Sequence, residues 1–533
     1  MKTFCAFLLL LAATGIAAAA DNPPNPAAKV NIVFILADDL GYGDVQCYNP
    51  QRGKIPTPNI DKLASQGMRF TDGHSSSGVC SPSRYALLTG RYHWRTRLQS
   101  GIVGVFGEPL IAPDRLTIAG LAKQHGYRTA CIGKWHLGWD WPIQKEQRRL
   151  FIAGKGENDE ASPREARLAA WREVFGRPIP GGPTTRGFDE YLGTDVPNWP
   201  PYCFIENNHT VGIPSELLPS RLLGGNPLMA SAPGPALKDW KLDAVLPALC
   251  DRACDTIERF AKRKEPFLIY MPLTSPHEPL AVNAPWKGKS GLTVYADFVM
   301  ETDAVVGRVL AALETSGAAD KTLVLFTSDN GKAAYTGAAE LEQLGHYPSG
   351  PLRGYKSSVY EGGHREPFIV RWPGVVRPGS VCGQLVHQAD IMRTLADILG
   401  TTLPDNAGED SFSFLPLLKG GDQPVRQHAV SCAASGVPGL RHGAWKLILA
   451  ADAPTKTTVQ LYNLVDDIGE SKNLAAAQPS RVGEMKALLE KIITDGRSTP
   501  GVAQENDVKV VRYPRAAGPK NMGKAKQQSP TSR

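Results

Sequence analysis

Polar residues that could bind a cation stand directly after two apolar runs of the chain. Asp38 and Asp39 follow the first run, and Asp329 and Asn330 follow another run far along the sequence. Adjacent carboxylates at the end of a strand either form a turn or need a cation to offset their repulsion and desolvation. Because all four side chains have oxygen atoms, the ion that they favour is Ca²⁺ or Mg²⁺ rather than zinc.

Basic residues follow two further apolar runs. Lys134 and His136 stand in GKWHLG, and His277 stands in SPHEP. A single histidine is more often structural or exposed than catalytic, but histidine transfers protons near neutral pH and a lysine can bind an anion beside a metal. Taken together, the four sets of residues predict a site for an ester of a tetrahedral oxyanion.

A parallel sheet would bring these residues together. Nearly continuous apolar runs are typical of buried strands, and the four runs here are KVNIVFILADD, YRTACIGKWHLG, EPFLIYMPLTSPHEP and KTLVLFTSDNGK. Helix-like segments lie at 58–66, 117–125, 242–263 and 295–315. This alternation predicts an α/β fold with a large, mixed, mostly parallel sheet flanked by helices, and such sheets place their sites beyond the carboxyl ends of the strands.

Cys80 stands in SSSGVCSPSRYALLTGRY, residues 75–92. A lone cysteine is usually a small buried hydrophobe. Here Pro82 and Arg84 follow it, and then the segment 89–91, Thr-Gly-Arg. This pattern resembles the signature of the formylglycine-dependent sulfatases, Cys-x-Pro-x-Arg followed by Thr-Gly-Arg. In that family a separate formylglycine-generating enzyme oxidises the cysteine to Cα-formylglycine, an aldehyde that hydrates to a geminal diol.

The resemblance extends from about residue 29 to residue 474 and implies a role for each candidate residue. It makes Asp38, Asp39, Asp329, Asn330 and the modified Cys80 ligands of Ca²⁺, with Mg²⁺ less expected. It gives Arg84 the support of the diol, assigns Lys134 and His136 to the Lys-x-His pair, places His277 beside the leaving group and places Lys356 on the sulfate. The fold implied is that of the alkaline phosphatase superfamily. Near the C-terminus, LYNLVDDIGESKNLA departs from the family pattern only at Asn463 and Ile468.

The resemblance also implies a mechanism. Lys134 and Lys356 hold the sulfate with the cation, and one diol hydroxyl, deprotonated with the help of a carboxylate such as Asp329, attacks sulfur. His277 protonates the departing alcohol. His136 then deprotonates the second hydroxyl, which expels sulfate and restores the aldehyde.

The motifs look closest to those of arylsulfatases and N-acetylgalactosamine-6-sulfatases, which suggests a sulfated carbohydrate as substrate. Trp199 and Tyr202 are candidates to stack on a sugar, and Glu206 and His346 are candidates to bind its hydroxyls, although aromatic residues in a Pro-rich loop are more often packing anchors. Two alternatives stay open: a phosphate or phosphonate ester hydrolase on the same scaffold, and a non-catalytic protein that binds sulfated glycans.

The remaining sequence predicts the domain organisation and the location of the protein. Residues 1–20 resemble a cleaved signal peptide, so we expect an exported, periplasmic or extracellular protein. Residues 28–419 are expected to form the catalytic domain, with loops and short helices over the site at 141–237, and residues 420–500 a small α+β domain with an antiparallel sheet and a helix near 482–495.

The charge of the chain gives little reason to expect a nucleic-acid partner. The formal charge is +7, and residues 501–533 account for +5 of it, from seven basic and two acidic side chains. We interpret this basic segment as a solvated, disordered tail rather than as a polyanion-binding arm. Apart from the signal-like start, we find no apolar stretch of about 20 residues, so stable membrane insertion is not expected.

Overall fold

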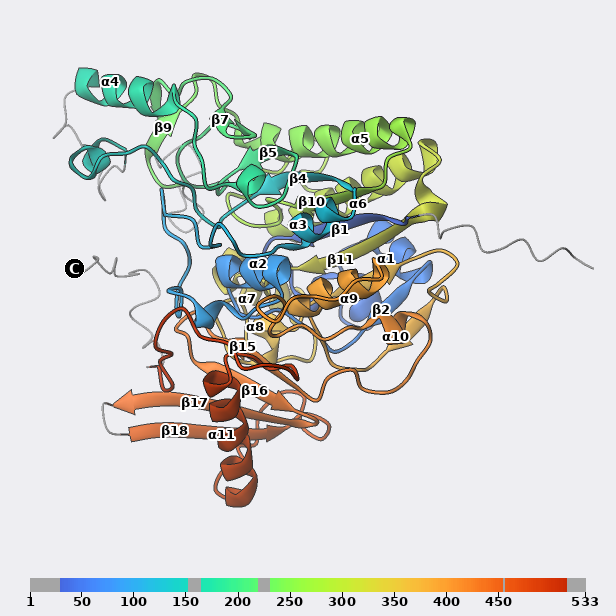
Figure 1. The fold of residues 1–533 in the computed structure, drawn as a ribbon. Coiled ribbons are helices and arrows are strands. Elements are labelled where there is room, and N and C mark those ends of the chain that lie inside the picture. The colour runs from blue at the N-terminus through green and yellow to red at the C-terminus, as the bar shows by residue number, and fades with distance from the viewer. Residues whose placement is uncertain (1–28, 152–163, 219–230, 454–455, 515–533) are drawn as a thin grey trace, which may run out of the picture.

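The computed structural model describes residues 29–151, 164–218, 231–453 and 456–514 of the 533-residue chain (Figure 1). Ten strands form one large sheet in the order β13-β2-β12-β11-β1-β10-β4-β5-β6-β7. Its five central strands are parallel to one another: β11(Thr322–Ser328), β1(Asn31–Ala37), β10(Phe267–Pro272), β4(Arg128–Lys134) and β5(Glu190–Thr194). The carboxyl ends of these five strands therefore meet at one edge of the sheet.

Shorter strands extend the sheet on both sides. Beyond β11 lie β12(Phe368–Arg371), β2(Met68–Phe70) and β13(Ser380–Cys382), and beyond β5 lie β6(Ile205–Glu206) and β7(His209–Thr210). Four of these junctions are antiparallel, which makes the sheet mixed. Two separate strand pairs join β3(Gly73–His74) to β14(Val386–His387), and β8(Glu216–Leu218) to β9(Gly234–Ala236).

Successive side chains of a strand point to opposite faces of the sheet, and in the central strands both sets of side chains are apolar. Helices therefore cover both faces of the large sheet. Val33, Ile35 and Ala37 of β1 belong to the core beneath α1(Pro58–Ser65), α5(Val245–Arg263) and α6(Val294–Thr315). Ile32, Phe34 and Leu36 belong to the opposite core, with α2(Cys80–Thr89), α3(Ile118–Gln124), α9(Ile391–Ile398) and α10(Leu415–Leu418). In Figure 1, α5 and α6 lie above β1, and α2 and α9 lie below it. The predicted fold class is thus confirmed.

A smaller antiparallel sheet follows α10 in the chain. It contains β15(His428–Cys432), β16(Pro438–His442), β17(Trp445–Ala453) and β18(Lys456–Asn463), and α11(Pro479–Thr494) packs on it. This sheet contacts the large domain close to the Cys-x-Pro-x-Arg segment: the Cys432 amide donates to the Ser76 carbonyl at 3.0 Å, and the Gly78 amide donates to the Cys432 carbonyl at 2.8 Å. The C-terminal sheet thereby holds the backbone that leads into Cys80.

Two regions differ from the sequence-based expectations. The segment 141–237 contains, besides loops, the strands β5 to β9 and the twelve-residue helix α4(Arg164–Phe175). The expected solvated tail does not begin at residue 501, because Asp507 forms an ion pair with Arg91 at 3.0 Å and Val510 is buried against the C-terminal domain. The rest of the expected tail, 515–533, and the predicted signal peptide, 1–20, lie outside the described residues.

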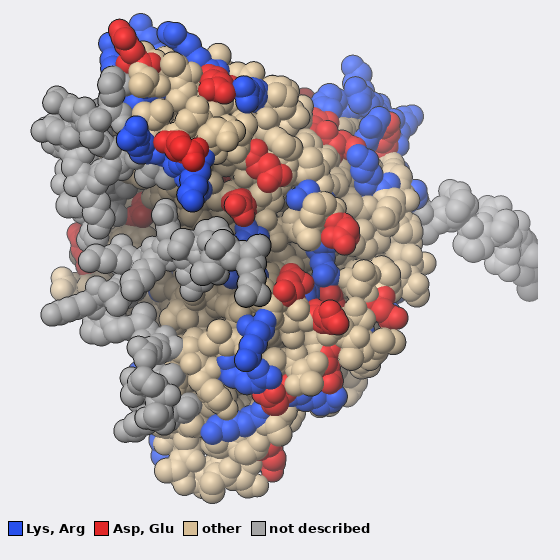
Figure 2. All heavy atoms as spheres, turned by 60° about the vertical axis from the view of Figure 1, so that its left-hand side comes forward, with Lys and Arg blue, Asp and Glu red and all other residues tan. Residues whose placement is uncertain are grey.

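The surface charges and the composition of the helices can be compared with those of polyanion-binding and membrane-spanning proteins. On the face in Figure 2, the basic and acidic side chains of the described residues are interspersed, whereas a polyanion-binding surface would gather basic ones. Of the helices in the described ranges, none has both the length and the apolar character that a membrane span requires.

Candidate active site

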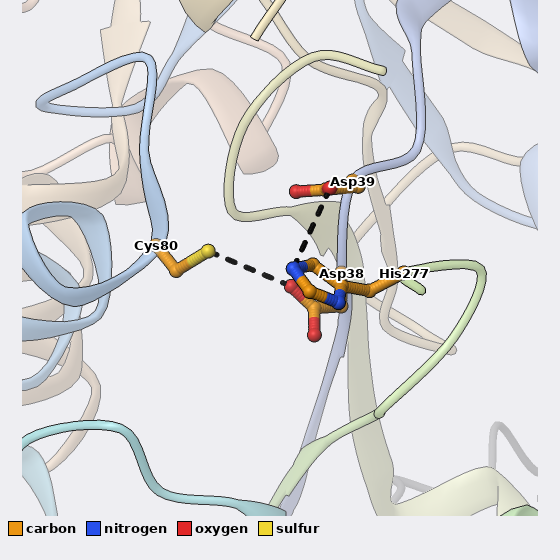
Figure 3. A group of neighbouring side chains, drawn as sticks. All are labelled: Asp38, Asp39, Cys80 and His277. Carbon is orange, nitrogen blue, oxygen red and sulfur yellow. Dashed lines mark hydrogen bonds and ion pairs between the residues drawn. The ribbon is translucent and has the colours of Figure 1, made fainter. Parts of the chain in front are cut away.

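Most of the predicted polar residues meet at the carboxyl edge of the large sheet. Ala37 of β1 pairs with Ser328 of β11, so Asp38 and Asp329, the residues that follow them, are neighbours. Figure 3 shows Asp38 and Asp39 at the end of β1, with Cys80 on one side and His277, from the loop after β10, on the other. One potential ligand atom from each of these four residues lies within 4.8 Å of the others. All four side chains are buried.

Cys80 is the first residue of α2, and the spacing of its motif fits this position. Arg84 follows one helical turn later, which places both side chains on the same face of the helix. Pro82 lies in the first turn, where a missing N–H breaks no helical hydrogen bond. The partial positive charge of a helix N-terminus favours an anion beside residue 80. The Sγ of Cys80 lies 3.8 Å from Oδ1 of Asp38.

Each of the three aspartates forms an ion pair with a different basic residue. Nζ of Lys134 lies 2.8 Å from Oδ2 of Asp38, and Nζ of Lys356 lies 2.7 Å from Oδ2 of Asp39. The guanidinium of Arg84 donates to Oδ2 of Asp329 through Nε at 3.0 Å and through Nη2 at 2.8 Å. Three buried negative charges are therefore offset by three positive charges inside the protein.

These neighbours change the pKa values of the site. Burial raises the pKa of the Asp38 carboxyl, but Lys134, His277 and Arg84 together outweigh burial and hold that pKa well below its usual value. Burial and the charge of Asp38 raise the pKa of Asp329 to about 6. Burial raises the pKa of the Cys80 thiol to about 12, so this thiol is not ionised at neutral pH and is a poor nucleophile.

The two histidines each have one ring nitrogen bound to a main-chain carbonyl. Nδ1 of His277 lies 2.5 Å from the carbonyl oxygen of Glu278, and Nε2 of His136 lies 3.1 Å from that of Val103. A carbonyl only accepts, so these nitrogens have the proton and the opposite nitrogens do not when the rings are neutral. Nε2 of His277 then faces Oδ2 of Asp39 at 3.7 Å.

Burial determines the charge of both rings. Burial and the charge of Lys134 lower the pKa of His277 to about 4, and the same two causes, with Arg84, hold the pKa of His136 well below its usual value. Nδ1 of His136 is buried and has no hydrogen-bond partner in the described structure. A neutral His136 thus presents a free proton acceptor.

The oxygen ligands of the site fit a hard cation. Oδ1 of Asn330 is buried and lacks a hydrogen-bond partner within the described ranges, while Nδ2 of the same side chain donates to Oδ1 of Asp39 at 2.7 Å. An unpaired buried oxygen beside carboxylates is costly unless a cation or a donor binds it. Asp38, Asp39 and Asn330 could therefore hold Ca²⁺ or Mg²⁺, with Asp329, whose oxygens also accept from Arg84 and from the Asp39 amide, as a further ligand.

Of the four predicted pocket residues, Trp199 alone contacts a residue of this site. Its ring meets the ring of His136 edge-on, with centroids 5.3 Å apart. Tyr202 is 2% exposed, and its hydroxyl lies within hydrogen-bond distance of two main-chain carbonyls, which is the arrangement of a packing anchor. Glu206 pairs with Arg252 of α5 at 2.8 Å.

His346 lies inside the protein and contacts none of the described residues gathered around Cys80. It is fully buried, its Nε2 lies 2.8 Å from Oδ1 of Asp44, and its Nδ1 accepts the amide of Lys54 at 2.9 Å. Both ring nitrogens are therefore occupied inside the protein. The structure thus places His346 on Asp44, 302 residues away in the chain, a partner that is not apparent from the local sequence.

The structure draws attention to two glutamates that were not identified from the sequence. Glu278 follows His277 directly, and Asn198 and Tyr335 converge on its carboxylate. Glu366 is fully buried with both carboxylate oxygens unpartnered in the described structure, and burial with the charges of Asp329 and Asp39 raises its pKa well above the usual value. The position of Glu278 in the SPHEP motif was the available signal; for Glu366 the sequence offers none.

This chain is similar to known proteins over most of its length. Residues 30–401 match the family model described as Sulfatase, and residues 355–497 match that described as N-sulphoglucosamine sulphohydrolase, C-terminal. The chain is 33% identical to an N-acetylgalactosamine-6-O-sulfatase of Bacteroides thetaiotaomicron over 519 residues, which cover 89% of this chain and 95% of that protein. It is 30% identical to the arylsulfatase A of Homo sapiens over 544 residues, 95% of this chain and 96% of that protein.

A solved structure gives the same result for the fold. A sulfatase from a study of glycosaminoglycan metabolism in Bacteroides thetaiotaomicron superposes with a TM-score of 0.74 at 31% identity. The superposition covers 87% of this chain and 99% of that one. Most of this chain therefore shares the fold of that sulfatase.

Proposed function

This chain belongs to the sulfatase family and is a sulfuric ester hydrolase, and we propose that it is an exported enzyme that removes sulfate from sulfated carbohydrates through a formylglycine at position 80 and a calcium ion. The observation that supports this most directly is the position of Cys80 at the N-terminus of α2, beside Asp38 and close to Lys134. The name of the relative from Bacteroides thetaiotaomicron suggests a 6-sulfated N-acetylgalactosamine as substrate.

The environment of Cys80 supports its conversion to formylglycine. A thiol with a pKa of about 12 is almost entirely protonated at pH 7 and cannot act as an efficient nucleophile. The hydrated aldehyde would supply two hydroxyls on one carbon, one to attack sulfur and one to expel the sulfate after its deprotonation. The conversion requires a formylglycine-generating enzyme as a partner during maturation.

The charges around residue 80 support a sulfate-binding role. Lys134 and Lys356 bind the sulfate oxygens and offset the charge that develops as the S–O bond breaks. Asp38, Asp39, Asp329 and Asn330 would hold Ca²⁺, which would supply further positive charge for the sulfate. Arg84 orients Asp329 through two hydrogen bonds and so fixes one side of the metal site.

The two histidines fit opposite proton transfers. Nε2 of His277 is the nitrogen free to protonate the departing alcohol, and Nδ1 of His136 is free to accept the proton of the second hydroxyl. Burial and Lys134 keep the His277 ring neutral in the free protein. A bound sulfate ester places negative charge beside Lys134 and Lys356, which raises the pKa of His277 toward the value that an acid needs.

A substrate panel tests the proposed function. Protein in which Cys80 has been converted should release sulfate from N-acetylgalactosamine 6-sulfate and from 4-nitrophenyl sulfate, and should act far more slowly on 4-nitrophenyl phosphate. Sulfate release is measured by ion chromatography, and the state of Cys80 is measured by mass spectrometry of its peptide. If fully converted protein binds these sulfate esters but releases no sulfate, it is a binding protein. If it releases phosphate faster than sulfate, it is a phosphoesterase.

Replacement of His277 by alanine tests the role of the acid. We expect kcat for N-acetylgalactosamine 6-sulfate to fall about 10²–10⁴-fold, because an alkoxide leaves poorly without a proton. The loss for 4-nitrophenyl sulfate should be much smaller, since nitrophenolate is a good leaving group. The matched control is His209→Ala, at an exposed histidine of β7. Equal losses on both substrates would exclude His277 as the acid.

A further inference from the structure

Glu278 is a carboxylate beside the site that the proposed mechanism does not use. Its Oε1 accepts the hydroxyl of Tyr335 at 3.2 Å and Nδ2 of Asn198 at 3.4 Å. Its Oε2 is buried and has no hydrogen-bond partner among the residues that the structure describes. One oxygen is thus fixed by two donors, and the other can accept a donor that the protein does not supply.

The residues around Glu278 come from three sides of the site. Asn198 lies in the segment after β5, next to Trp199, whose ring contacts His136. Glu278 follows β10 and binds Nδ1 of His277 through its main-chain carbonyl. Tyr335 follows β11 and is 40% exposed. Loops that follow three separate strands of the sheet, β5, β10 and β11, therefore converge where an alcohol beside His277 would lie.

The charged residues of the site change the pKa of Glu278. Burial raises its pKa to about 7. The charge of Asp39 adds to this rise, whereas the charges of Lys356 and Lys134 oppose it. Burial also raises the pKa of the Tyr335 hydroxyl; the charge of Lys356 lowers it and the charge of Asp39 raises it. Lys356 and Lys134 are the residues proposed to hold the sulfate, and the main-chain carbonyl of Glu278 binds the ring of the proposed acid, His277.

The chemistry of the free oxygen selects the kind of group that it accepts. A carboxylate oxygen accepts a hydroxyl proton well, and leaving it unpaired while buried is costly. An aryl ring offers it no donor, and a second sulfate or a carboxylate on the substrate would repel it. A neutral sugar with a hydroxyl near its sulfated carbon fits it best.

We propose that Glu278, held by Tyr335 and Asn198, accepts a hydroxyl of the leaving-group sugar and makes the enzyme selective for hydroxylated alcohols. This inference rests on the proposed sulfatase function and names the group that recognises its substrate. Glu278 is a specificity residue in this role, and sulfur transfer itself does not require it.

Three substrates distinguish this role from the acid role of His277. They are N-acetylgalactosamine 6-sulfate, cyclohexylmethyl sulfate, which is an alkyl ester without hydroxyls, and 4-nitrophenyl sulfate. Glu278→Ala should lower kcat/KM for the sugar about 10- to 100-fold, as expected for a hydrogen bond to a charged group, and should leave the other two substrates within about threefold of the wild type. Loss of the acid at His277 would instead affect both alkyl esters.

Two further variants and a control complete the test. Glu278→Gln retains the shape but not the charge and should show a smaller loss that is again specific to the sugar. Tyr335→Phe removes one donor that fixes the carboxylate. It should also lower kcat/KM for the sugar more than for the other two substrates. Glu340→Gln, the same change at an exposed position of α7(Ala338–Gln343), should match the wild type on all three substrates.

The outcomes separate this proposal from the proposed function. If Glu278→Ala retains full activity on the sugar, or loses activity equally on all three substrates, Glu278 does not recognise a sugar hydroxyl. If converted wild-type protein releases sulfate from none of the three, the proposed function itself fails. Activity of the variants on 4-nitrophenyl sulfate shows that they are folded.

Discussion

Replacing Cys80 with serine is expected to leave the protein folded and to reduce sustained sulfate release by at least about 10⁴-fold, as for loss of a catalytic nucleophile. The fold should tolerate the change because Sγ makes one polar contact, at 3.8 Å with Asp38. Serine has one hydroxyl on its Cβ, so it can accept sulfate from the substrate but has no second hydroxyl to expel it. The variant should therefore stop with sulfate bound to residue 80.

Mass spectrometry of the peptide that contains residue 80 checks this result. After incubation with substrate, the Cys80→Ser peptide should gain the mass of one SO₃ group, and the matched Cys80→Ala peptide should gain none. Wild-type protein produced without a formylglycine-generating enzyme should behave like the alanine variant. Sustained turnover by any of these three proteins would contradict the diol mechanism.

Removal of the cation is expected to abolish activity without unfolding the protein. A Lewis-acid cation contributes several kcal/mol to catalysis, so chelation should lower kcat/KM by at least about 10³-fold. The fold should survive, because Lys134, Lys356 and Arg84 already form ion pairs with the three carboxylates. Thermal unfolding should still shift downward, since an ion at 100 times its Kd stabilises the folded state by about 2.7 kcal/mol.

Re-addition experiments identify the ion and its ligands. Ca²⁺ should restore activity to chelated protein more completely than Mg²⁺, because the ligand set offers several carboxylate and amide oxygens. Asn330→Ala should raise the Ca²⁺ concentration needed for half-maximal activity, since Oδ1 of Asn330 is the unpartnered oxygen beside Asp39. Full activity in protein with far less than one bound metal ion per chain would contradict the calcium proposal.

The parts of the site that the sequence predicted are those set by local patterns. Buried strands with polar ends are recognisable along the chain, and parallel pairing then brings Asp38 and Asp329 together, as observed. Cys80 and Arg84 are four residues apart, and a helix over this segment places them on one face. In the segment 141–237 we expected loops and short helices, and α4 is one helix there, with Trp171, Val174 and Phe175 at helical spacing. The short strands β5 to β9 were not expected, because the many Pro, Gly and charged residues hide any strand pattern.

The parts that the sequence could not predict depend on partners far along the chain. The two nitrogens of His346 are occupied by Asp44 and Lys54, and nothing near His346 indicates this. Glu278 can be recognised as a candidate binding residue only from its contacts with Asn198 and Tyr335, which reach it from other loops. Asp507 was assigned to a solvated tail because the segment around it is basic and rich in Pro and Gly, yet it pairs with Arg91 of the Thr-Gly-Arg segment.

The contacts of the C-terminal region have a consequence for the timing of maturation. All ten residues of α2 are buried, and the backbone before Cys80 binds Cys432 while Arg91 after it binds Asp507. The segment 75–92 can therefore reach its final place only after about 430 further residues have been synthesised, which takes roughly 20–90 s at typical rates of synthesis. During that interval Cys80 is still accessible, and afterwards it is enclosed. The oxidation proposed for Cys80 must therefore take place before Asp507 pairs with Arg91 and the segment is enclosed.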